Sequence, residues 1–439
     1  MLSLLLAVAA AAAPTCDVVT YGARPGDGRS DSQAFDRAIR ACEGRGGRVV
    51  VPAGTFDLGQ VRLGSDMEFH LAGGAVLKAS TRLEDFPAVP ALDGHRAFVV
   101  ATGATNLLLS GSGTIDGSGP AYWSAVRLTG YRDTELAPDA DVRRFRFGLA
   151  VQGCRNLRVR DLTVRDTPMF LMAVKDCDDV VIDGVTLTAP DDSPNTDGLQ
   201  IIDSSDVRVS NCNIAVGDDA IVTKARTRII ERLIVTGCRL RSDDGAIKFG
   251  TRSESGVRDS IFSNIVIDES RYGIALFMIH GGVYENNRFS DIRIATGGRH
   301  PRHYAVFVDV DNRAPQRGLG RIRGLTFSGL DITTGGNILI GGHPAAPVED
   351  LTLSDIRMRV TGAQDLARTA SKPRGNRRFN AVPGSPDHSA VAAHVVLGDV
   401  RGATIRGLDV SGSSASDRRP ALATPSSSGI RGELSSDVR

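Results

Sequence analysis

Three aspartates stand in two short polar runs of the chain. Asp197 belongs to the run Asn-Thr-Asp-Gly at 195–198, and Asp218 and Asp219 belong to the run Gly-Asp-Asp-Ala at 217–220. Hydrolysis of a bond between two sugars needs such a group, because one carboxylic acid protonates the leaving oxygen while carboxylate activates a water molecule. A ladder of aspartates that caps turns or binds a cation would have the same spacing. The spacing alone leaves both interpretations open, so the elements that position these residues must decide.

A repeated unit surrounds the two runs. Each copy contains an apolar residue, a small polar residue, a turn residue and a second apolar residue, as in Phe262–Ile265 and Phe289–Ile292. The equivalent apolar positions are 159, 182, 209, 235, 262, 289, 327 and 353, which are 23, 27, 26, 27, 27, 38 and 26 residues apart. Copies at Leu109 and Ile405 lie 50 and 52 residues from their neighbours, so we expect about two units in each gap. Repeats of this length indicate stacked supersecondary units.

The units have the pattern of short strands, because apolar and polar residues alternate and Gly, Asn and Asp punctuate the segments. One amphipathic helix is predicted after Asp31. Four apolar residues from Phe35 to Cys42 fall on one face, and Ser30 or Asp31 can cap the first turn. A stack needs a cap over its end. The sequence therefore predicts an all-β fold, a right-handed single-stranded parallel β-helix with an N-terminal capping helix.

The ends of the chain and one internal stretch differ from the repeats. Residues 1–13 are apolar and end in small residues, like a signal peptide, and are too short to span a bilayer. We therefore expect a secreted or periplasmic protein. Residues 14–410 are expected to form the catalytic β-helix, with 363–392 as a loop insertion and 411–439 as a flexible Ser-rich tail.

Composition limits the partners. The net charge of +1, from 52 basic and 51 acidic residues, gives no reason to expect nucleic acid or a membrane as a partner, and we expect a monomer. Among the six cysteines, Cys16 and Cys42 can link the first strand to the capping helix, whereas Cys212 and Cys238 occupy equivalent repeat positions and are expected to be buried thiols. No spacing of Cys and His indicates zinc, and no phosphate-binding loop precedes a helix. We expect neither cofactor nor metal.

Alignment of the following strand in each unit places the aspartates in space. The segments 197–201, 219–223, 245–249 and 272–276 match one another. Equivalent positions in a parallel stack lie about 4.8 Å apart. Asp197 and Asp219 are therefore predicted to stand one above the other on an outer face, with Asp218 beside them. Carboxylates so close raise the pKa of at least one member, which keeps that member protonated as an acid.

The two polar runs, at this separation in such a repeat, resemble the first two motifs of glycoside hydrolase family 28, the polygalacturonases and their relatives. The resemblance covers nearly the whole chain. Further matching segments are Tyr21–Ala23 with Gly26–Gly28, Val51–Gly54, and Gly113–Gly117 leading to Trp123.

The resemblance implies an exported, metal-independent hydrolase that acts on pectin-type polysaccharides or oligosaccharides and inverts the anomeric centre. By position, it implies that Asp218 is the general acid. Asp197 and Asp219 would hold the water and deprotonate it. Asn195, in the same motif as Asp197, is a candidate for substrate binding.

Two other motifs of the family are replaced. The family's Gly-His-Gly corresponds to Asp244–Ala246, which lacks histidine. Its Arg-Ile-Lys, whose cations hold the galacturonate carboxylate, corresponds to Ala275–Phe277. The loss predicts feeble action on unmodified polygalacturonan, and Phe277 favours a methyl-bearing or neutral sugar.

Cations of neighbouring units are candidates to replace the lost pair. Lys248 has the offset of the lost arginine one unit earlier, and Lys224 has that of the lost lysine two units earlier. Arg252 and Tyr272 are further candidates for substrate binding. For each lysine, a place on a solvated surface is an equal alternative.

Two other functions stay open at this point. A pectate-lyase-like β-helix would use calcium-binding carboxylates and an arginine base, and would release an unsaturated product. A catalytically silent carbohydrate-binding β-helix would keep the fold without turnover. Chelation and a reducing-sugar assay distinguish these functions from the hydrolase.

Overall fold

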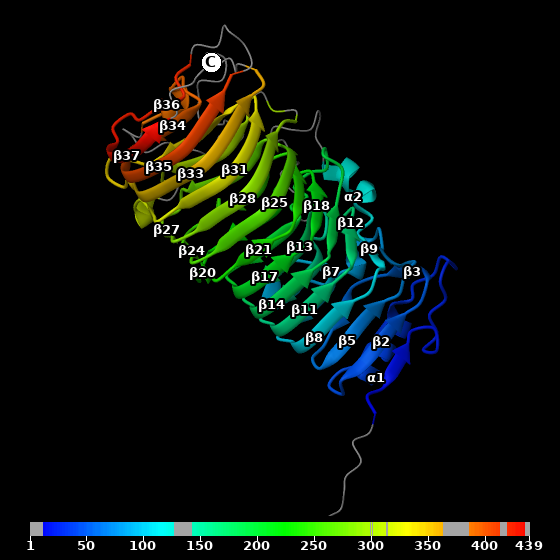
Figure 1. Cartoon of the computed structure of the whole chain (residues 1–439). Helices are drawn as coiled ribbons and strands as arrows, with labels where there is room; N and C mark the ends of the chain where they lie inside the picture. Colours follow the sequence, from blue (N-terminus) through cyan, green and yellow to red (C-terminus); the bar gives the residue numbers. More distant parts are fainter. Residues whose placement is uncertain are drawn as a thin grey trace, which may run out of the picture.

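Parallel strands stack along one axis in the computed structural model of this chain (Figure 1). The structure describes residues 12–126, 143–298, 300, 302–312, 315–362, 386–412 and 419–434. Within these residues, each turn of the chain adds one strand to a sheet of 12 strands and further strands to a sheet of 25. The strands of both sheets pair in parallel, as in β16 with β19 and β11 with β14 (bounds below). The fold is the predicted right-handed parallel β-helix.

The smaller sheet carries the candidate site. Its strands, in order along the axis, are β4 (Val61–Leu63), β7 (Ala97–Thr102), β10 (Phe147–Gln152), β13 (Phe170–Lys175), β16 (Leu199–Ile202), β19 (Ile221–Lys224), β23 (Gly245–Phe249), β26 (Tyr272–Met278), β29 (Tyr304–Val310), β32 (Asn337–Gly341), β34 (Val395–Gly398) and β36 (Leu422–Ala423). Alternate residues face inward and outward. The inward column through Leu199 and Ile221 belongs to the apolar core. The outward column runs from Gln200 through Val222 to Lys248.

The larger sheet supplies the rest of each coil. Its strands are β1 (Thr15–Asp17), β2 (Gly47–Val51), β3 (Gly54–Leu58), β5 (Met67–Leu71), β6 (Ala75–Ala79), β8 (Thr105–Ser110), β9 (Thr114–Asp116), β11 (Arg155–Arg160), β12 (Thr163–Arg165), β14 (Asp178–Asp183), β15 (Thr186–Thr188), β17 (Ser205–Ser210), β18 (Asn213–Val216), β20 (Ile230–Glu231), β21 (Ile234–Thr236), β22 (Arg239–Ser242), β24 (Gly256–Arg258), β25 (Ile261–Ser270), β27 (Val283–Glu285), β28 (Arg288–Thr296), β30 (Arg321–Arg323), β31 (Thr326–Thr334), β33 (Val348–Val360), β35 (Val400–Ser411) and β37 (Ser428–Leu434). The repeat seen in the sequence is a core column of this sheet. Phe262 pairs with Phe289, which pairs with Phe327, and their rings stack with centroids 5.0 and 5.1 Å apart.

The two long gaps in the repeat each hold one coil, so the expectation of two units was wrong. Leu109 pairs directly with Val159, and Leu353 pairs directly with Ile405. The extra residues leave the stack between strands. Most of the predicted insertion, 363–385, lies outside the described residues. An insertion and an extra coil add the same length to a gap, and only strand pairing distinguishes them.

The N-terminal end is closed as predicted. Helix α1 (Ser32–Cys42) buries its apolar face on the first strands. Asp31 precedes the helix, but its carboxylate accepts the Arg24 N–H and does not cap the first turn. Cys16 forms a disulfide with Cys42, and the other four cysteines are buried thiols. Residues 1–11 of the predicted signal peptide lie outside the described residues.

The C-terminal tail predicted from 411 was wrong over its described part. β36 pairs with β34, and β37 pairs with β35, which adds a coil as far as Leu434. Leu422 and Ile430 pack against the core, so the Ser-rich composition hid a strand pattern. Residues 413–418 and 435–439 lie outside the described residues.

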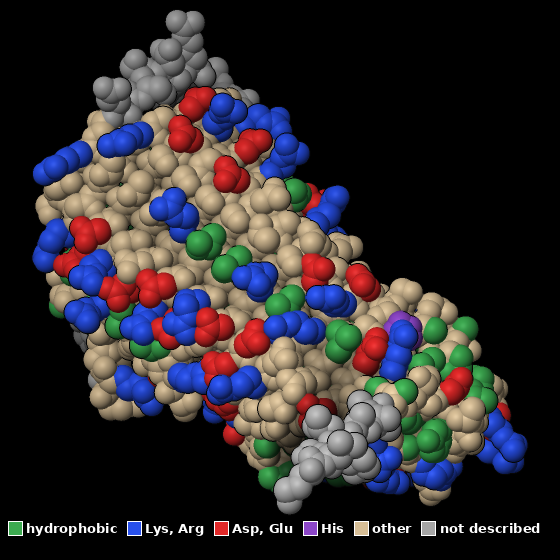
Figure 2. All heavy atoms as spheres, turned by 60° about the horizontal axis from the view of Figure 1, so that its bottom comes forward, with side chains coloured by type: hydrophobic (Ala, Val, Ile, Leu, Met, Phe, Trp, Pro, Cys, Tyr) green, Lys and Arg blue, Asp and Glu red, His purple; other side chains and the backbone are tan. Residues whose placement is uncertain are grey.

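The surface carries mixed charge. Basic and acidic side chains are interspersed on the face shown in Figure 2. Ion pairs link side chains of neighbouring coils, as between Arg232 and Asp206 at 2.7 Å. In the described part of the chain, we find no helix whose length and hydropathy would let it cross a membrane.

Candidate active site

The register of the smaller sheet brings the three aspartates together. Leu199 pairs with Ile221, which puts Asp197 and Asp219 at neighbouring positions just ahead of β16 and β19. One carboxylate oxygen from each of Asp197, Asp218 and Asp219 lies within 4.8 Å of the others. The predicted stacking of the aspartates is therefore confirmed. Asp197 and Asp219 are only 3% and 5% exposed, whereas Asp218 is half-buried.

The residue types of the first motif are explained by the bend that they form. Asn195 has a φ of 53°, a left-handed conformation that asparagine tolerates better than most residues. Its Nδ2 donates to Asp218 Oδ2 at 3.4 Å. Thr196 Oγ1 accepts the Gly217 N–H at 3.1 Å, so the first motif holds the second in place.

Two glycines of the motifs are required by close backbone contacts. A Cβ on Gly217 would lie 2.6 Å from the carbonyl oxygen of Ser193 and 2.7 Å from that of Pro190. A Cβ on Gly198 would lie 2.6 Å from the carbonyl oxygen of Ala220. Side chains here would separate the two coils that carry the carboxylates.

A buried arginine that sequence reasoning missed fixes the first motif from outside the repeat. Arg144 donates to the carbonyl oxygens of Pro168 and Pro194 at 2.8 and 3.0 Å, and to Asn195 Oδ1 at 3.0 Å. The side chain is 1% exposed. No repeat signal could reveal it, because Arg144 comes before β10 in an excursion from the stack.

Each predicted water-holding aspartate has a lysine partner. Lys224 Nζ donates to Asp197 Oδ2 at 2.9 Å, and Gln200 donates to the same oxygen at 2.6 Å. Lys248 Nζ donates to Asp219 Oδ1 at 2.9 Å. Lys224 and Lys248 are thus brought to the site, as the aligned columns predicted.

Asp244 is a fourth carboxylate that the sequence analysis did not single out as a site residue. It accepts from Lys248 Nζ at 2.8 Å and from Arg271 Nη1 at 3.2 Å. These two cations lower the pKa of Asp244 below its usual range. Asp244 therefore stays ionised beside the three motif aspartates.

Asp218 differs from its neighbours in having no ion pair among the described residues. Burial, together with the charge of Asp197, which outweighs that of Lys248, raises the pKa of Asp218 to about 7. Burial also raises the pKa of Asp219, but the contact with Lys248 opposes that rise. The cluster of aspartates therefore retains a proton near neutral pH. We assign this proton to Asp218, because Asp219 has the cationic partner.

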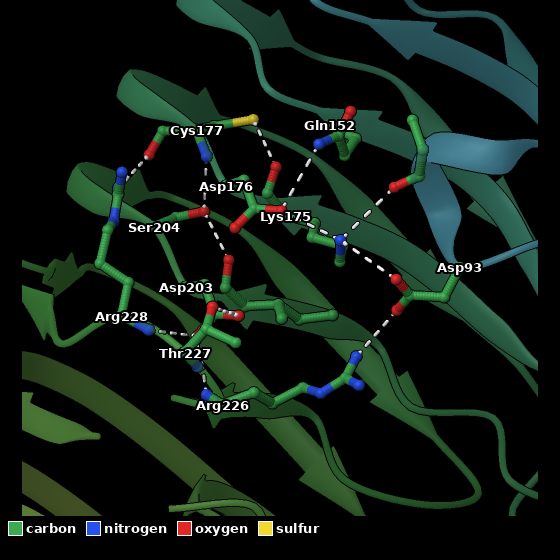
Figure 3. Close-up of polar contacts among 12 residues, drawn as sticks. Asp93, Gln152, Lys175, Asp176, Cys177, Asp203, Ser204, Arg226, Thr227 and Arg228 are labelled. Carbon is green, nitrogen blue, oxygen red and sulfur yellow. Dashed lines mark hydrogen bonds and ion pairs between the residues drawn. The ribbon is translucent and has the colours of Figure 1, made fainter. Parts of the chain in front are cut away.

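The end of β19 is held by a polar network beside the site (Figure 3). Asp203 Oδ1 accepts the backbone N–H groups of Arg226, Thr227 and Arg228 at 2.7, 2.9 and 3.2 Å. Arg226 in turn pairs with Asp93 at 3.0 Å. The network fixes the turn that follows Lys224, and so fixes the backbone from which that lysine reaches Asp197.

Apolar covers border the site on the outer face of the sheet. Val89 and Leu92 pack over β7, β10 and β13, ahead of the aspartates. Ala393, with the partly buried Val391, packs over β26, β29 and β32 beyond them. The coils that carry the aspartates lie between these two covers.

Two sequence-based expectations, those for Tyr272 and Phe277, fail here. Tyr272 is 1% exposed and stacks on Tyr304 with a centroid distance of 5.5 Å, so its ring is not offered to a substrate. Phe277 is 6% exposed in the same apolar cluster and cannot present the expected face to a sugar. Arg252 is exposed and pairs with Glu254 at 2.5 Å, and its part in substrate binding stays a prediction.

An aromatic ring that was not predicted borders the carboxylates instead. Phe170 occupies the column of Asp197 one coil earlier, as the register of β13 and β16 shows, and is half-buried. Lys224 Nζ lies 4.6 Å from its ring centroid, and the Arg146 guanidinium lies 5.9 Å from it. The 27-residue offset between 170 and 197 could have revealed this position.

Comparison with known proteins supports the resemblance to glycoside hydrolases. A family model described as glycosyl hydrolases family 28 matches residues 42–365. The chain belongs to this family. An exopolygalacturonase from Zea mays is 30% identical to this chain over 59% of the chain, and the match spans only 61% of that protein. A polygalacturonase from Medicago sativa is 25% identical over 86% of this chain and 90% of its own length. The solved structure of a family 28 exopolygalacturonase from Yersinia enterocolitica has the same fold, with a TM-score of 0.68 at 17% identity over 95% of this chain and 78% of that one.

Proposed function

We propose that this family 28 protein is an exported hydrolase that cleaves glycosidic bonds in pectic polysaccharides or oligosaccharides. One observation carries the proposal: within the described part of the chain, Asp218 lacks a cationic partner while Asp197 and Asp219 each have one. Acid-assisted hydrolysis of an acetal needs a carboxyl group that keeps a proton beside carboxylates that can bind the attacking water.

In the proposed reaction, Asp218 donates its proton to the glycosidic oxygen as the bond to the anomeric carbon breaks. Asp197 and Asp219 accept hydrogen bonds from one water, and one of them takes its proton as the water attacks. Two O–H···O bonds of about 2.7 Å can span the gap of up to 4.8 Å between these carboxylates. Attack from the face opposite the leaving oxygen inverts the anomeric centre.

The carboxyl groups lie closer together than the separation usual in inverting glycosidases, about 6.5–9.5 Å. That rule describes an acid and a single base with water between them. Here the distances from the acid, Asp218, to Asp197 and Asp219 are also at most 4.8 Å. We propose inversion because both bases share one water, which leaves neither of them as the nucleophile. The anomer released in the first turnover decides between inversion and retention.

For substrate binding we propose the half-buried surface that borders the acid. Asn195 contacts Asp218 and can orient a sugar hydroxyl beside it. Phe170 offers an apolar ring for the flat face of a sugar, and Lys224 and Arg146 above that ring suit a sugar carboxylate. Export fits the Cys16–Cys42 disulfide, since such bonds persist in oxidising compartments.

The test is product analysis on homogalacturonan, rhamnogalacturonan and short oligogalacturonides side by side. We expect new reducing ends without an ultraviolet-absorbing unsaturated product, and no effect of a chelator. A calcium-dependent, unsaturated product would identify a lyase. Binding of these substrates with no release of reducing ends would identify a silent carbohydrate-binding protein.

A further inference from the structure

We propose that Lys248 is a positioning residue for the attacking water: its ammonium group orients the Asp219 carboxylate and does not hold the substrate. The proposal rests on the proposed function, in which Asp219 binds and deprotonates that water. It replaces the sequence-based expectation that Lys248 binds a sugar carboxylate.

The contacts of the ammonium group are already carboxylates of the protein. Lys248 Nζ donates to Asp219 Oδ1 at 2.9 Å and to Asp244 Oδ2 at 2.8 Å, and its side chain is 10% exposed. The Gly245 N–H also donates to Asp219 Oδ1, at 3.2 Å. Two donors on one oxygen fix the orientation of the carboxylate and favour its charged form.

The surroundings of Lys248 are shaped to hold its flexible stem in one place. A Cβ on Gly245 would lie 3.2 Å from the Cβ and Cδ of Lys248, so a side chain there would displace the lysine. Ala275 is the ladder partner of Lys248 and leaves room beside it. The ring centroid of Phe277 lies 5.4 Å from Nζ. These three positions are the ones at which the sequence departs from the family's histidine, arginine and lysine, and together they form the walls around Lys248.

The charges around Asp219 also support a positioning role for Lys248. The ionisable groups that face this region from the neighbouring coils include Asp197, Asp218, Asp219, Asp243, Asp244, Lys224, Lys248, Arg271, Tyr272 and His300. Lys224 contacts Asp197, and Arg271 contacts Asp244. Among the described residues, Lys248 alone forms an ion pair with Asp219, so its removal leaves that buried carboxylate facing other acidic groups. Asp219 would then take up a proton at a higher pH and cease to act as a base.

A positioning role and a substrate-binding role make different predictions for Lys248→Met, which keeps most of the unbranched stem and removes the charged group. For positioning, we expect the pKa of Asp219 to rise by about one unit or more and the acidic limb of the pH profile to move up with it. The value of kcat should fall about tenfold or more at neutral pH, with KM nearly unchanged. For substrate binding, KM for acidic substrates should rise about tenfold while the pH profile stays in place.

The experiment combines carboxyl-carbon NMR titration of aspartate-labelled protein with kinetics. The Asp219 signal is assigned by its loss in Asp219→Asn, and Lys248→Arg tests rescue by a second cation. Lys78→Met is the control, because Lys78 is exposed and lies in β6 of the larger sheet, outside the sheet that carries the site. We expect the control to leave the titration and kcat within about twofold of wild type.

Asp244→Asn should shift the pH profile in the direction opposite to that of Lys248→Met. Loss of that negative charge frees Lys248 for Asp219, so the acidic limb should move to lower pH, and this decides the matter if Lys248→Met does not fold. An unmoved Asp219 titration in the Lys248 variant, or an unmoved limb in the Asp244 variant, overturns the proposal. The titration needs no substrate: if the wild type cleaves nothing, the proposed function fails while the position of Lys248 is still tested.

Discussion

Replacement of Asp218 by asparagine tests the assignment of the general acid. The substitution keeps the shape of the side chain and removes the transferable proton. The pKa of Asp218 is raised from 3.8 to about 7. At pH 7, roughly half of the Asp218 carboxyl groups are therefore protonated, whereas an ordinary aspartate would be protonated in fewer than about one molecule in a thousand.

The expected loss follows from this role. General acid catalysis contributes about 10²–10⁴-fold, equivalent to about 2.7–5.4 kcal/mol of transition-state stabilisation. We expect kcat on an oligosaccharide to fall by this factor in Asp218→Asn. Binding should be nearly unchanged, because the amide can still accept from Asn195. A nitrophenyl glycoside of the same sugar should lose much less, since its leaving group departs without a proton.

The assay measures both substrates across pH, with Asp206→Asn as the control because Asp206 is 48% exposed and pairs only with a surface arginine in the described structure. Wild-type activity on the oligosaccharide should fall as pH rises through about 7, because the acid must be protonated to act. The variant should lack this limb on the nitrophenyl substrate. Activity within about threefold of wild type, or an equal loss on both substrates, would remove Asp218 from the role.

Three further outcomes are expected. Gly217→Ala should lower the free energy of unfolding by about 1–3 kcal/mol and abolish activity, because the new Cβ would meet the carbonyl oxygens of Ser193 and Pro190 at 2.6 and 2.7 Å. Thermal unfolding and turnover measurements check this, and an active variant of wild-type stability would contradict it. Replacement of Cys16 and Cys42 by serine should cost about 3 kcal/mol in denaturant unfolding, since the bond closes a loop with a sequence separation of 26. Proton NMR of the first products should show the inverted anomer; release of the retained anomer would refute the shared-water mechanism.

The sequence by itself determined the stack and the grouping of the acids. Apolar residues in every coil must face the same narrow core, so their spacing fixes the register from coil to coil. That register carried Asp197 to the level of Asp219, and it carried Lys224 and Lys248 to the same face. These are consequences of a local rule repeated many times, which is why they could be read without coordinates.

Repeat length was less informative wherever the chain leaves the stack. The gaps around Leu109 and Ile405 each contain one coil, because an excursion lengthens a gap without adding a strand. Arg144 lies in one such excursion, and its contacts with the first motif have no counterpart in other coils. Only the folded chain places it.

The tertiary structure also decided what each side chain meets. Tyr272 occupies the predicted column but is buried under an apolar cover, so its place in the repeat did not give its exposure. Lys248 reached the predicted region, yet its charge is directed at Asp219 and Asp244. A repeat fixes the level and the face of a side chain. The partners of a long, flexible charge depend on the electrostatic balance of all the coils around it, and that balance exists only in the folded state.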